Sequence, residues 1–190
     1  MYGLVNKAIQ DLVTEKFGAE CWKQVVATAN IETSRFVTTH VYDDKVTYDL
    51  VRAVSSVLNI SPEATLLTIG KFWIDFVKRN GFESLLAANG NCLVDFLRNL
   101  DSFHSRLAAN YPEYVSPEFH FRQHDDGVVD LGYFSKRPGF APMVEGMIRG
   151  LANHFGEKIE MECQNRIDAV HFLITFADVP STVTDVAISG

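Results

Sequence analysis

Cysteine is scarce in this chain, and the spacing of the few present excludes the sites that cysteines usually build. Only Cys21, Cys92 and Cys163 occur among 190 residues, and no two of them form a CxxC pair, which argues against a zinc ribbon or a dithiol redox site. The CxxCH motif of covalent haem attachment is also missing. We therefore expect three buried, reduced thiols.

Basic clusters and long apolar runs are absent as well. Lysine and arginine number 17 against 24 acidic residues, and the net charge is −7, so neither nucleic acid nor an anionic membrane is an expected partner. No apolar run approaches the roughly 20 residues that a membrane-spanning helix needs. The N-terminal sequence MYGLVNKAIQDLV lacks the basic region and cleavage site of a signal peptide, so we expect a cytoplasmic protein.

The sequence motifs of several common enzyme classes are missing. GxSxG, the Walker loop, GxGxxG and HExxH do not occur. Two acidic pairs, at 43–44 and 125–126, fall in turn-like contexts, so we interpret them as cap or loop residues and not as catalytic dyads. His154, Cys163 and His171 are residue types that bind zinc, but their spacing does not indicate that they meet at one metal ion. An enzymatic function therefore has little support.

The composition is that of an ordinary globular chain. Apolar residues make up 47% and charged residues 22%, and no internal repeat or low-complexity segment interrupts the sequence. We expect a single domain over residues 1–182 and a frayed tail over residues 183–190.

Apolar residues recur at helical spacing up to about residue 110, and strand patterns follow. Gly18 is expected to stop the first helix, and the sequence SPE at 61–63 supplies the cap, proline and acid that open another. The sequence DDG at 125–127 predicts a hairpin turn. The expected helices cover residues 4–17, 20–29, 43–58, 61–78, 82–88, 91–109 and 140–155, and the expected strands cover 119–124, 128–133, 158–163 and 170–177. This order predicts an α+β fold, with helices first and a β-β-α-β-β unit after them.

His104 is the first candidate functional residue. It shares one helical stripe with Leu97, Leu100 and Leu107, so its imidazole is expected on the buried side of the helix. A buried imidazole needs a partner, because an unpaired polar group in the core is costly. The stripe alone favours a hydrogen-bonded core histidine over a metal ligand, and both interpretations stay open.

The second candidate is the segment that contains Tyr133, Ser135 and Arg137. These three alternate along extended chain, so their side chains point to one side. Two hydroxyls and a guanidinium arranged in this way can bind carboxylates, with the guanidinium donating two hydrogen bonds. The spacing by itself equally fits a solvated edge strand.

His104, Pro117 and the pattern Tyr133-x-Ser135-x-Arg137 together resemble the haem nitric oxide/oxygen-binding (H-NOX) family. That family includes the haem domain of soluble guanylate cyclase and the cyanobacterial H-NOX proteins. The similarity covers nearly the whole chain, and it is carried by the segments MYGLVNKAIQDLV, YDDKVTYDLV, NLDSFHSRLAANYPEYVSPEF and YFSKRPGFAPMVEGMI.

The resemblance implies an N-terminal helical subdomain and a C-terminal four-stranded antiparallel sheet with a helix, enclosing non-covalent haem b. It assigns His104 as the axial iron ligand and Pro117 as the residue that presses on the porphyrin. Tyr133, Ser135 and Arg137 would hold the haem propionates. The remaining implied pocket residues are Val5, Ile9, Trp73, Leu100, Met143 and Met147.

The distal positions bear on the choice of gas. Oxygen-binding members place a tyrosine where Met143 stands here, and neither Met143 nor Ile9 can donate a hydrogen bond. Bound O₂ carries partial negative charge and needs a donor, whereas NO needs one much less. We therefore expect NO and CO binding with weak O₂ binding. The alternative is an O₂ sensor in which the Trp73 N–H donates, and Trp73 could instead only pack against the porphyrin.

The family mechanism implied here is a switch, in which NO weakens the bond between iron and His104 and the domain shifts. No catalytic domain is expected, so the output would pass to a partner. Histidine kinases, diguanylate cyclases, and fused cyclase or chemoreceptor modules are the partners that the family implies. A domain that kept the fold and lost haem is a further alternative.

Overall fold

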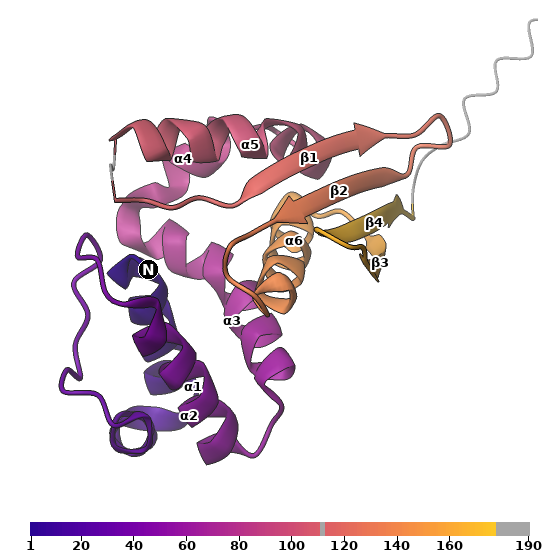
Figure 1. The fold of residues 1–190 in the computed structure, drawn as a ribbon. Coiled ribbons are helices and arrows are strands. Elements are labelled where there is room, and N and C mark those ends of the chain that lie inside the picture. The colour runs from indigo at the N-terminus through magenta and orange to yellow at the C-terminus, as the bar shows by residue number, and fades with distance from the viewer. Residues whose placement is uncertain (111–112, 178–190) are drawn as a thin grey trace, which may run out of the picture.

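The computed structural model describes residues 1–110 and 113–177, which form a helical part followed by a sheet (Figure 1). The predicted tail over residues 183–190, and with it the end of the predicted domain, lies outside the described residues. The elements are α1 (Gly3–Ala29), α2 (Asp44–Leu58), α3 (Pro62–Val77), the π-helical turn η1 (Lys78–Phe82), α4 (Glu83–Ala87), α5 (Leu93–Asn110), β1 (Glu118–Gln123), β2 (Val129–Phe134), α6 (Ala141–Phe155), β3 (Ile159–Asn165) and β4 (Val170–Phe176). The α+β class and the order of elements predicted from the sequence are confirmed.

The break predicted at Gly18 is confirmed. The element α1 runs from Gly3 to Ala29, but Gly18 within it has a φ of 86° and a ψ of 168°, which are not helical values. Two helical segments therefore meet at a kink there. Glycine allows this positive φ because it has no Cβ.

Side-chain caps begin α2 and α3 as the sequence predicts. The Asp43 carboxylate accepts a hydrogen bond from the Lys45 backbone N–H, and the Ser61 hydroxyl accepts one from the Ala64 backbone N–H. Each cap satisfies one of the backbone donors left free at a helix start. Pro62 occupies the first helical turn, where its missing N–H costs nothing.

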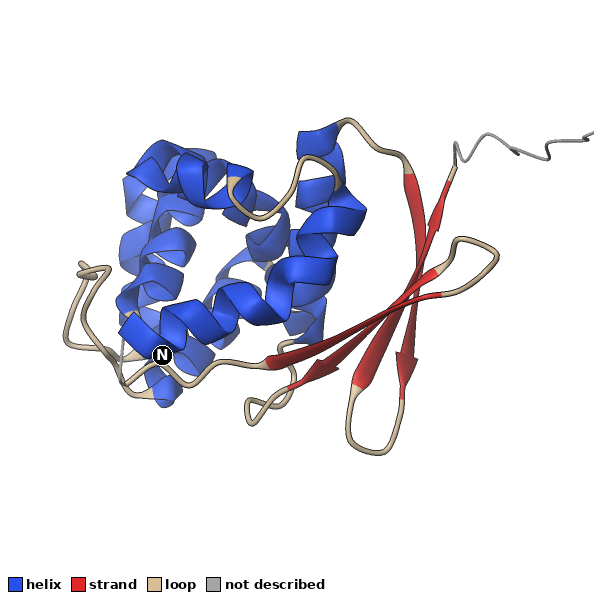
Figure 2. Cartoon of the chain, turned by 90° about the horizontal axis from the view of Figure 1, so that it is seen from above, coloured by secondary structure: helices blue, strands red, loops and turns tan. Residues whose placement is uncertain are grey.

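The four strands form one antiparallel sheet in the order β1-β2-β4-β3. Figure 2 shows the helices gathered on one side of this sheet. Alternate residues of the central strands are fully buried beneath the helices, namely Val129, Leu131, Phe172 and Ile174. One continuous core extends from α1 to β4, so the sheet and the helices share their apolar interior.

Close packing of α3 against α6 fixes the position of α6. A Cβ added to Gly70 would lie 2.1 Å from the Met143 carbonyl oxygen, and one added to Gly146 would lie 2.3 Å from the Leu67 carbonyl oxygen. Only glycine permits such an approach of the two backbones. Because this contact fixes α6 against α3, it also fixes the positions of Met143 and Met147.

One of the three cysteines departs from the prediction of buried thiols. Cys163 is exposed on the edge strand β3, so the prediction of three buried thiols is wrong there, because an edge strand is not fully covered by the helices. Cys21 and Cys92 are partly buried, and all three thiols are free. His154, Cys163 and His171 contact different residues, and no metal-binding cluster of His, Cys, Asp or Glu occurs among the described residues. None of the helices over residues 1–110 and 113–177 combines the length and apolar character needed to cross a membrane.

Candidate functional site

A cavity of about 360 Å³ lies where the helical part meets the sheet. Its volume falls in the range of small-molecule and cofactor sites. The start of α1, α3, α4, α5, β1, β2, the segment after β2, and α6 all contribute to its lining, which is mainly apolar. The lining includes nearly all of the site residues predicted from the sequence: Val5, Trp73, Leu100, His104, Pro117, Tyr133, Ser135, Arg137, Met143 and Met147.

Ile9 is the exception among those residues. It is buried in α1, with 1% of its surface exposed, and it is not part of the cavity lining. Val5, one turn earlier on the same helix, does line the cavity. Ile9 therefore supports the cavity from within the core.

His104 projects from α5 into this cavity, as the apolar stripe predicts. Burial lowers the pKa of the imidazole to about 4, against a smaller opposing effect from Asp101, so the ring is neutral near pH 7. Its Nδ1 lies 2.7 Å from the Tyr114 hydroxyl oxygen. No described residue hydrogen-bonds to Nε2, so this nitrogen keeps a lone pair or a proton for a partner in the cavity.

Aromatic rings hold the imidazole in place. Phe119 of β1 stacks on His104 with ring centroids 5.2 Å apart and planes 29° apart. Tyr114, in the segment between α5 and β1, lies nearly parallel to it at 15°. Burial raises the pKa of Tyr114 to about 12, so its side chain is a neutral phenol. The ring of His104 is thus fixed by packing as well as by a hydrogen bond.

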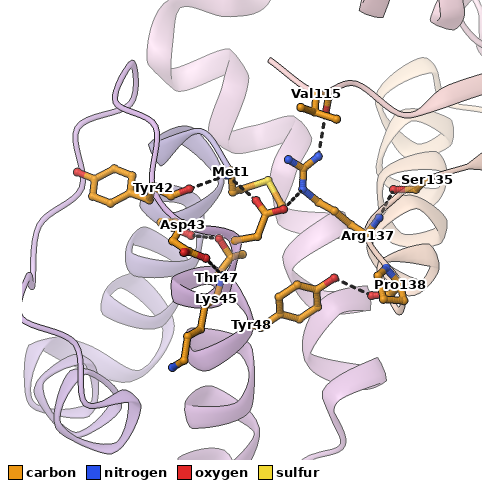
Figure 3. A network of polar contacts seen from close by, with 12 residues as sticks. Met1, Tyr42, Asp43, Lys45, Thr47, Tyr48, Val115, Ser135, Arg137 and Pro138 are labelled. Atoms are coloured by element: carbon orange, nitrogen blue, oxygen red, sulfur yellow. Dashed lines mark hydrogen bonds and ion pairs between the residues drawn. The ribbon is translucent and has the colours of Figure 1, made fainter. Parts of the chain in front are cut away.

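Arg137 connects the cavity to the N-terminal helices (Figure 3). Its Nε donates to the Asp44 carboxylate at 2.8 Å, and its Nη1 donates to the Val115 carbonyl oxygen at 2.7 Å. The N-terminal amine of Met1 also donates to Asp44, at 2.5 Å. Burial by itself raises the pKa of the Asp44 carboxyl. Hydrogen bonds from Met1 and Arg137 outweigh burial and hold this pKa below its usual range. Nη2 of Arg137 has no hydrogen bond to a described residue.

Tyr133 and Ser135 bring two hydroxyls close to Arg137. Tyr133 is buried in β2, and its pKa is raised mainly by that burial, while Ser135 and Arg137 oppose the change. The Ser135 hydroxyl accepts a hydrogen bond from the Arg137 backbone N–H at 3.1 Å, which shapes the turn after β2. The structure therefore gathers the predicted Tyr-x-Ser-x-Arg side chains at one cavity, and a carboxylate-bearing ligand could be held there.

Trp73 of α3 lines the cavity next to Phe76, with ring centroids 5.7 Å apart. Its indole N–H donates to no described residue. Met143 and Met147 line the cavity from α6, and Met143 is buried. Among the described residues of α3 and α6 that line the cavity, the Trp73 indole is therefore the one side chain whose N–H could donate a hydrogen bond to a ligand.

Two residues of the site escape the sequence analysis. Tyr114 follows His104 by ten positions, outside the helical stripe, so no local pattern relates them. The sequence predicts Asp44 at a helix start, and it does begin α2. Its carboxylate also pairs with Arg137, which lies 93 residues later in the sequence. Only the tertiary structure brings either pair together.

Comparison with known proteins identifies the family and the fold of the chain. The model of a family described as haem-NO-binding matches residues 2–163. The soluble guanylate cyclase gcy-35 of Caenorhabditis elegans is 31% identical over 170 residues, which make up 87% of this chain and 25% of that protein. The soluble guanylate cyclase 89Da of Drosophila melanogaster is 27% identical over 171 residues, or 88% of this chain and 26% of that protein. The chain thus spans about a quarter of the length of these cyclases.

Solved structures share the fold. The H-NOX protein of S. oneidensis in its Fe(II)NO state superposes with a TM-score of 0.84 at 17% identity, covering 94% of this chain and 100% of that one. The unliganded Fe(II) H-NOX protein of K. algicida gives a TM-score of 0.82 at 20% identity, covering 94% and 98%. An H-NOX domain of Shewanella oneidensis has also been solved in its Fe(II)CO state, with a TM-score of 0.81 at 18% identity, covering 94% and 100%.

Proposed function

Because this chain belongs to the haem-NO-binding family, we propose that it is a gas sensor that holds one haem b without covalent bonds. A ferrous haem in the cavity would supply the iron that binds NO or CO. The observation that supports this most directly is His104, a neutral imidazole whose Nε2 is not hydrogen-bonded to any described residue and whose ring lines a cavity of cofactor size. A neutral ring nitrogen is what iron coordination requires.

Arg137, Ser135 and Tyr133 would hold the propionates of this haem. The guanidinium keeps Nη2 for a carboxylate while Asp44 and Val115 fix its other nitrogens. Anchored in this way, Arg137 loses little side-chain entropy when it binds a ligand. Pro117 lines the same cavity and would contact the porphyrin.

The α6 side chains favour NO and CO over O₂. Met143 lines the cavity and has no hydrogen-bond donor, so a bound O₂ would find no stabilising partner there. The alternative is an O₂ sensor of the same fold in which Trp73 donates, and the indole N–H that meets no described residue keeps this second function open. We favour the first, because an indole beside Phe76 in an apolar wall also fits simple packing.

The proposed output is a change of shape passed to another protein or module. His104 of α5 and Pro117 line the same cavity, so gas binding to a haem held there would bias the position of α5 relative to the sheet, as in a two-state element. The domain would therefore regulate and not catalyse. A histidine kinase, a diguanylate cyclase, or a fused cyclase or chemoreceptor module would receive the change. The similarity to cyclases that are about four times longer fits a regulatory role of this kind.

Absorption spectroscopy of the purified protein tests this function. We expect a Soret band in the reduced protein, a shift of that band with NO and with CO, and no stable oxy spectrum in air. A protein that takes up no haem would refute the proposal. A stable oxy spectrum that disappears in Trp73→Phe would instead establish the O₂-sensing alternative.

A further inference from the structure

We propose that Tyr114 is a positioning residue for His104: its hydroxyl fixes the ring orientation and accepts the Nδ1 proton of the tautomer that leaves Nε2 for iron. This inference rests on the proposed function, because it concerns how the axial ligand is prepared. The contact itself, between Nδ1 and the hydroxyl oxygen at 2.7 Å, has the length of a good hydrogen bond.

The chemistry of a neutral imidazole decides which group donates. Such a ring carries one N–H, on Nδ1 or on Nε2. With the proton on Nε2, Tyr114 would donate to Nδ1, and Nε2 could not bind a metal. With the proton on Nδ1, the ring donates to the Tyr114 oxygen, and Nε2 keeps its lone pair. A phenol hydroxyl can donate to Nδ1 in the first tautomer and accept from it in the second. Iron binding requires the second tautomer, with the proton on Nδ1, and Tyr114 stabilises it by accepting that proton in a hydrogen bond.

The surroundings of Tyr114 fix its hydroxyl relative to the helix. The residue belongs to the segment between α5 and β1, and its ring contacts Tyr2 of the N-terminal segment at a centroid distance of 5.9 Å. The carbonyl of the next residue, Val115, accepts the Nη1 hydrogen bond of Arg137. The short segment 114–115 therefore contacts His104, the N-terminal segment and Arg137 at once.

This arrangement gives Tyr114 two consequences for the site. A hydrogen bond from Nδ1 makes the imidazole a stronger ligand, so its loss weakens the bond from Nε2 to iron. Because the same residue contacts Tyr2, movement of His104 away from the cavity would also disturb the N-terminal segment. Tyr114 thereby relates the position of the axial ligand to the helical part of the molecule.

The test is Tyr114→Phe, which removes only the hydroxyl and keeps the ring contacts with His104 and Tyr2. The matched control is Tyr42→Phe, since the Tyr42 hydroxyl accepts from the Val37 backbone N–H and does not line the cavity. In the reduced, haem-loaded protein we expect a lower iron–histidine stretching frequency in resonance Raman spectra and about tenfold faster haem loss for Tyr114→Phe. Tyr42→Phe should match the wild type in both.

A second readout needs no haem. In the apoprotein, the ¹⁵N signal of His104 Nδ1 should shift in Tyr114→Phe and stay in place in Tyr42→Phe. Unchanged Raman frequency and unchanged Nδ1 signal would overturn the inference while leaving the gas-sensing proposal intact. A wild-type protein without haem would refute the sensing proposal, and the Nδ1 signal would still decide whether Tyr114 orients the ring.

Exogenous ligands keep the test decisive should Tyr114→Phe fold poorly. In His104→Gly, imidazole can donate its second N–H to Tyr114, whereas 1-methylimidazole cannot. We expect imidazole to bind about fivefold more tightly than 1-methylimidazole, which is the value of one neutral hydrogen bond. Equal binding of the two ligands would contradict the role assigned to Tyr114.

Discussion

The two sides of the cavity are built from different chemistry. One side, the polar side, comes from α5 and the chain around β1 and β2, and it carries His104, Tyr114, Tyr133 and Arg137. The other, the apolar side, comes from α1, α3 and α6 and carries Val5, Trp73, Met143 and Met147. The polar side has the groups that could fix a cofactor in place, whereas the apolar side would select what binds to it. Mutations on the two sides should therefore affect different measurements.

Removal of His104, the proposed axial ligand, should have the largest effect. We expect His104→Gly to lose nearly all haem, because His104 is the one imidazole among the described residues that line the cavity, and exogenous imidazole should restore it. The ratio of Soret absorbance to protein absorbance measures the occupancy. The control is His124→Gly, an exposed histidine beside the hairpin turn, which should retain haem fully. Full retention in His104→Gly without imidazole would count against the polar side as the anchor.

Acid should destabilise the apoprotein through the same residue. His104 has its pKa lowered to about 4 in the folded state, below the unfolded value of about 6.5, so the unfolded chain binds the proton more readily. The contribution of His104 to the free energy of unfolding is therefore fully present above pH 6.5. It falls by about 3 kcal/mol as the pH decreases towards 4. Urea unfolding at several pH values measures this loss. It should be smaller in His104→Gln, and an equal loss in both proteins would contradict the burial argument.

Loss of the guanidinium should weaken haem retention without abolishing it. Arg137→Ala removes the ion pair with Asp44 and the charged hydrogen-bond donor proposed to hold the propionates. We expect haem transfer to apomyoglobin to become about 10- to 100-fold faster, as for the loss of hydrogen bonds to a charged group. Lys136→Ala, at the exposed neighbouring position, is the control. Identical haem-transfer rates for the two variants would show that Arg137 does not help to hold the haem.

A donor placed on the apolar side should change the choice of gas and leave haem retention alone. Met143→Tyr puts a hydroxyl into the cavity, and we expect O₂ affinity to rise about tenfold. Trp73→Phe, which removes the indole N–H, should change O₂ binding less than about twofold if that ring only packs. Oxygen titration of the reduced proteins measures both. A loss of haem in Met143→Tyr with no gain in O₂ affinity would break the division between the two sides.

Local rules predicted most of the fold and the side of its helix on which His104 lies. The caps at Asp43 and Ser61 and the hairpin turn at 125–127 are decided by neighbouring residues, so the sequence indicates them correctly. The stripe that contains His104 likewise follows from helical periodicity. Gly18 likewise marks the break between two helical segments, because glycine readily adopts the positive φ found there.

The remaining features depend on contacts between distant residues. Nothing near Arg137 in the sequence points to Asp44, and no local pattern relates His104 to Tyr114, so each pair is recognised only in the tertiary structure. Ile9 has the apolar spacing expected of a pocket residue but is covered by the core. Periodicity predicts that a side chain is buried, and it does not tell which buried side chains border a cavity.

The central claim is that His104 binds iron and that NO alters this bond. A difference spectrum between the reduced protein and the same protein with NO tests it most directly. We predict a Soret band in the reduced state that moves to shorter wavelength when NO is added. A reduced protein without a Soret band, or one whose Soret band does not respond to NO, would contradict the account.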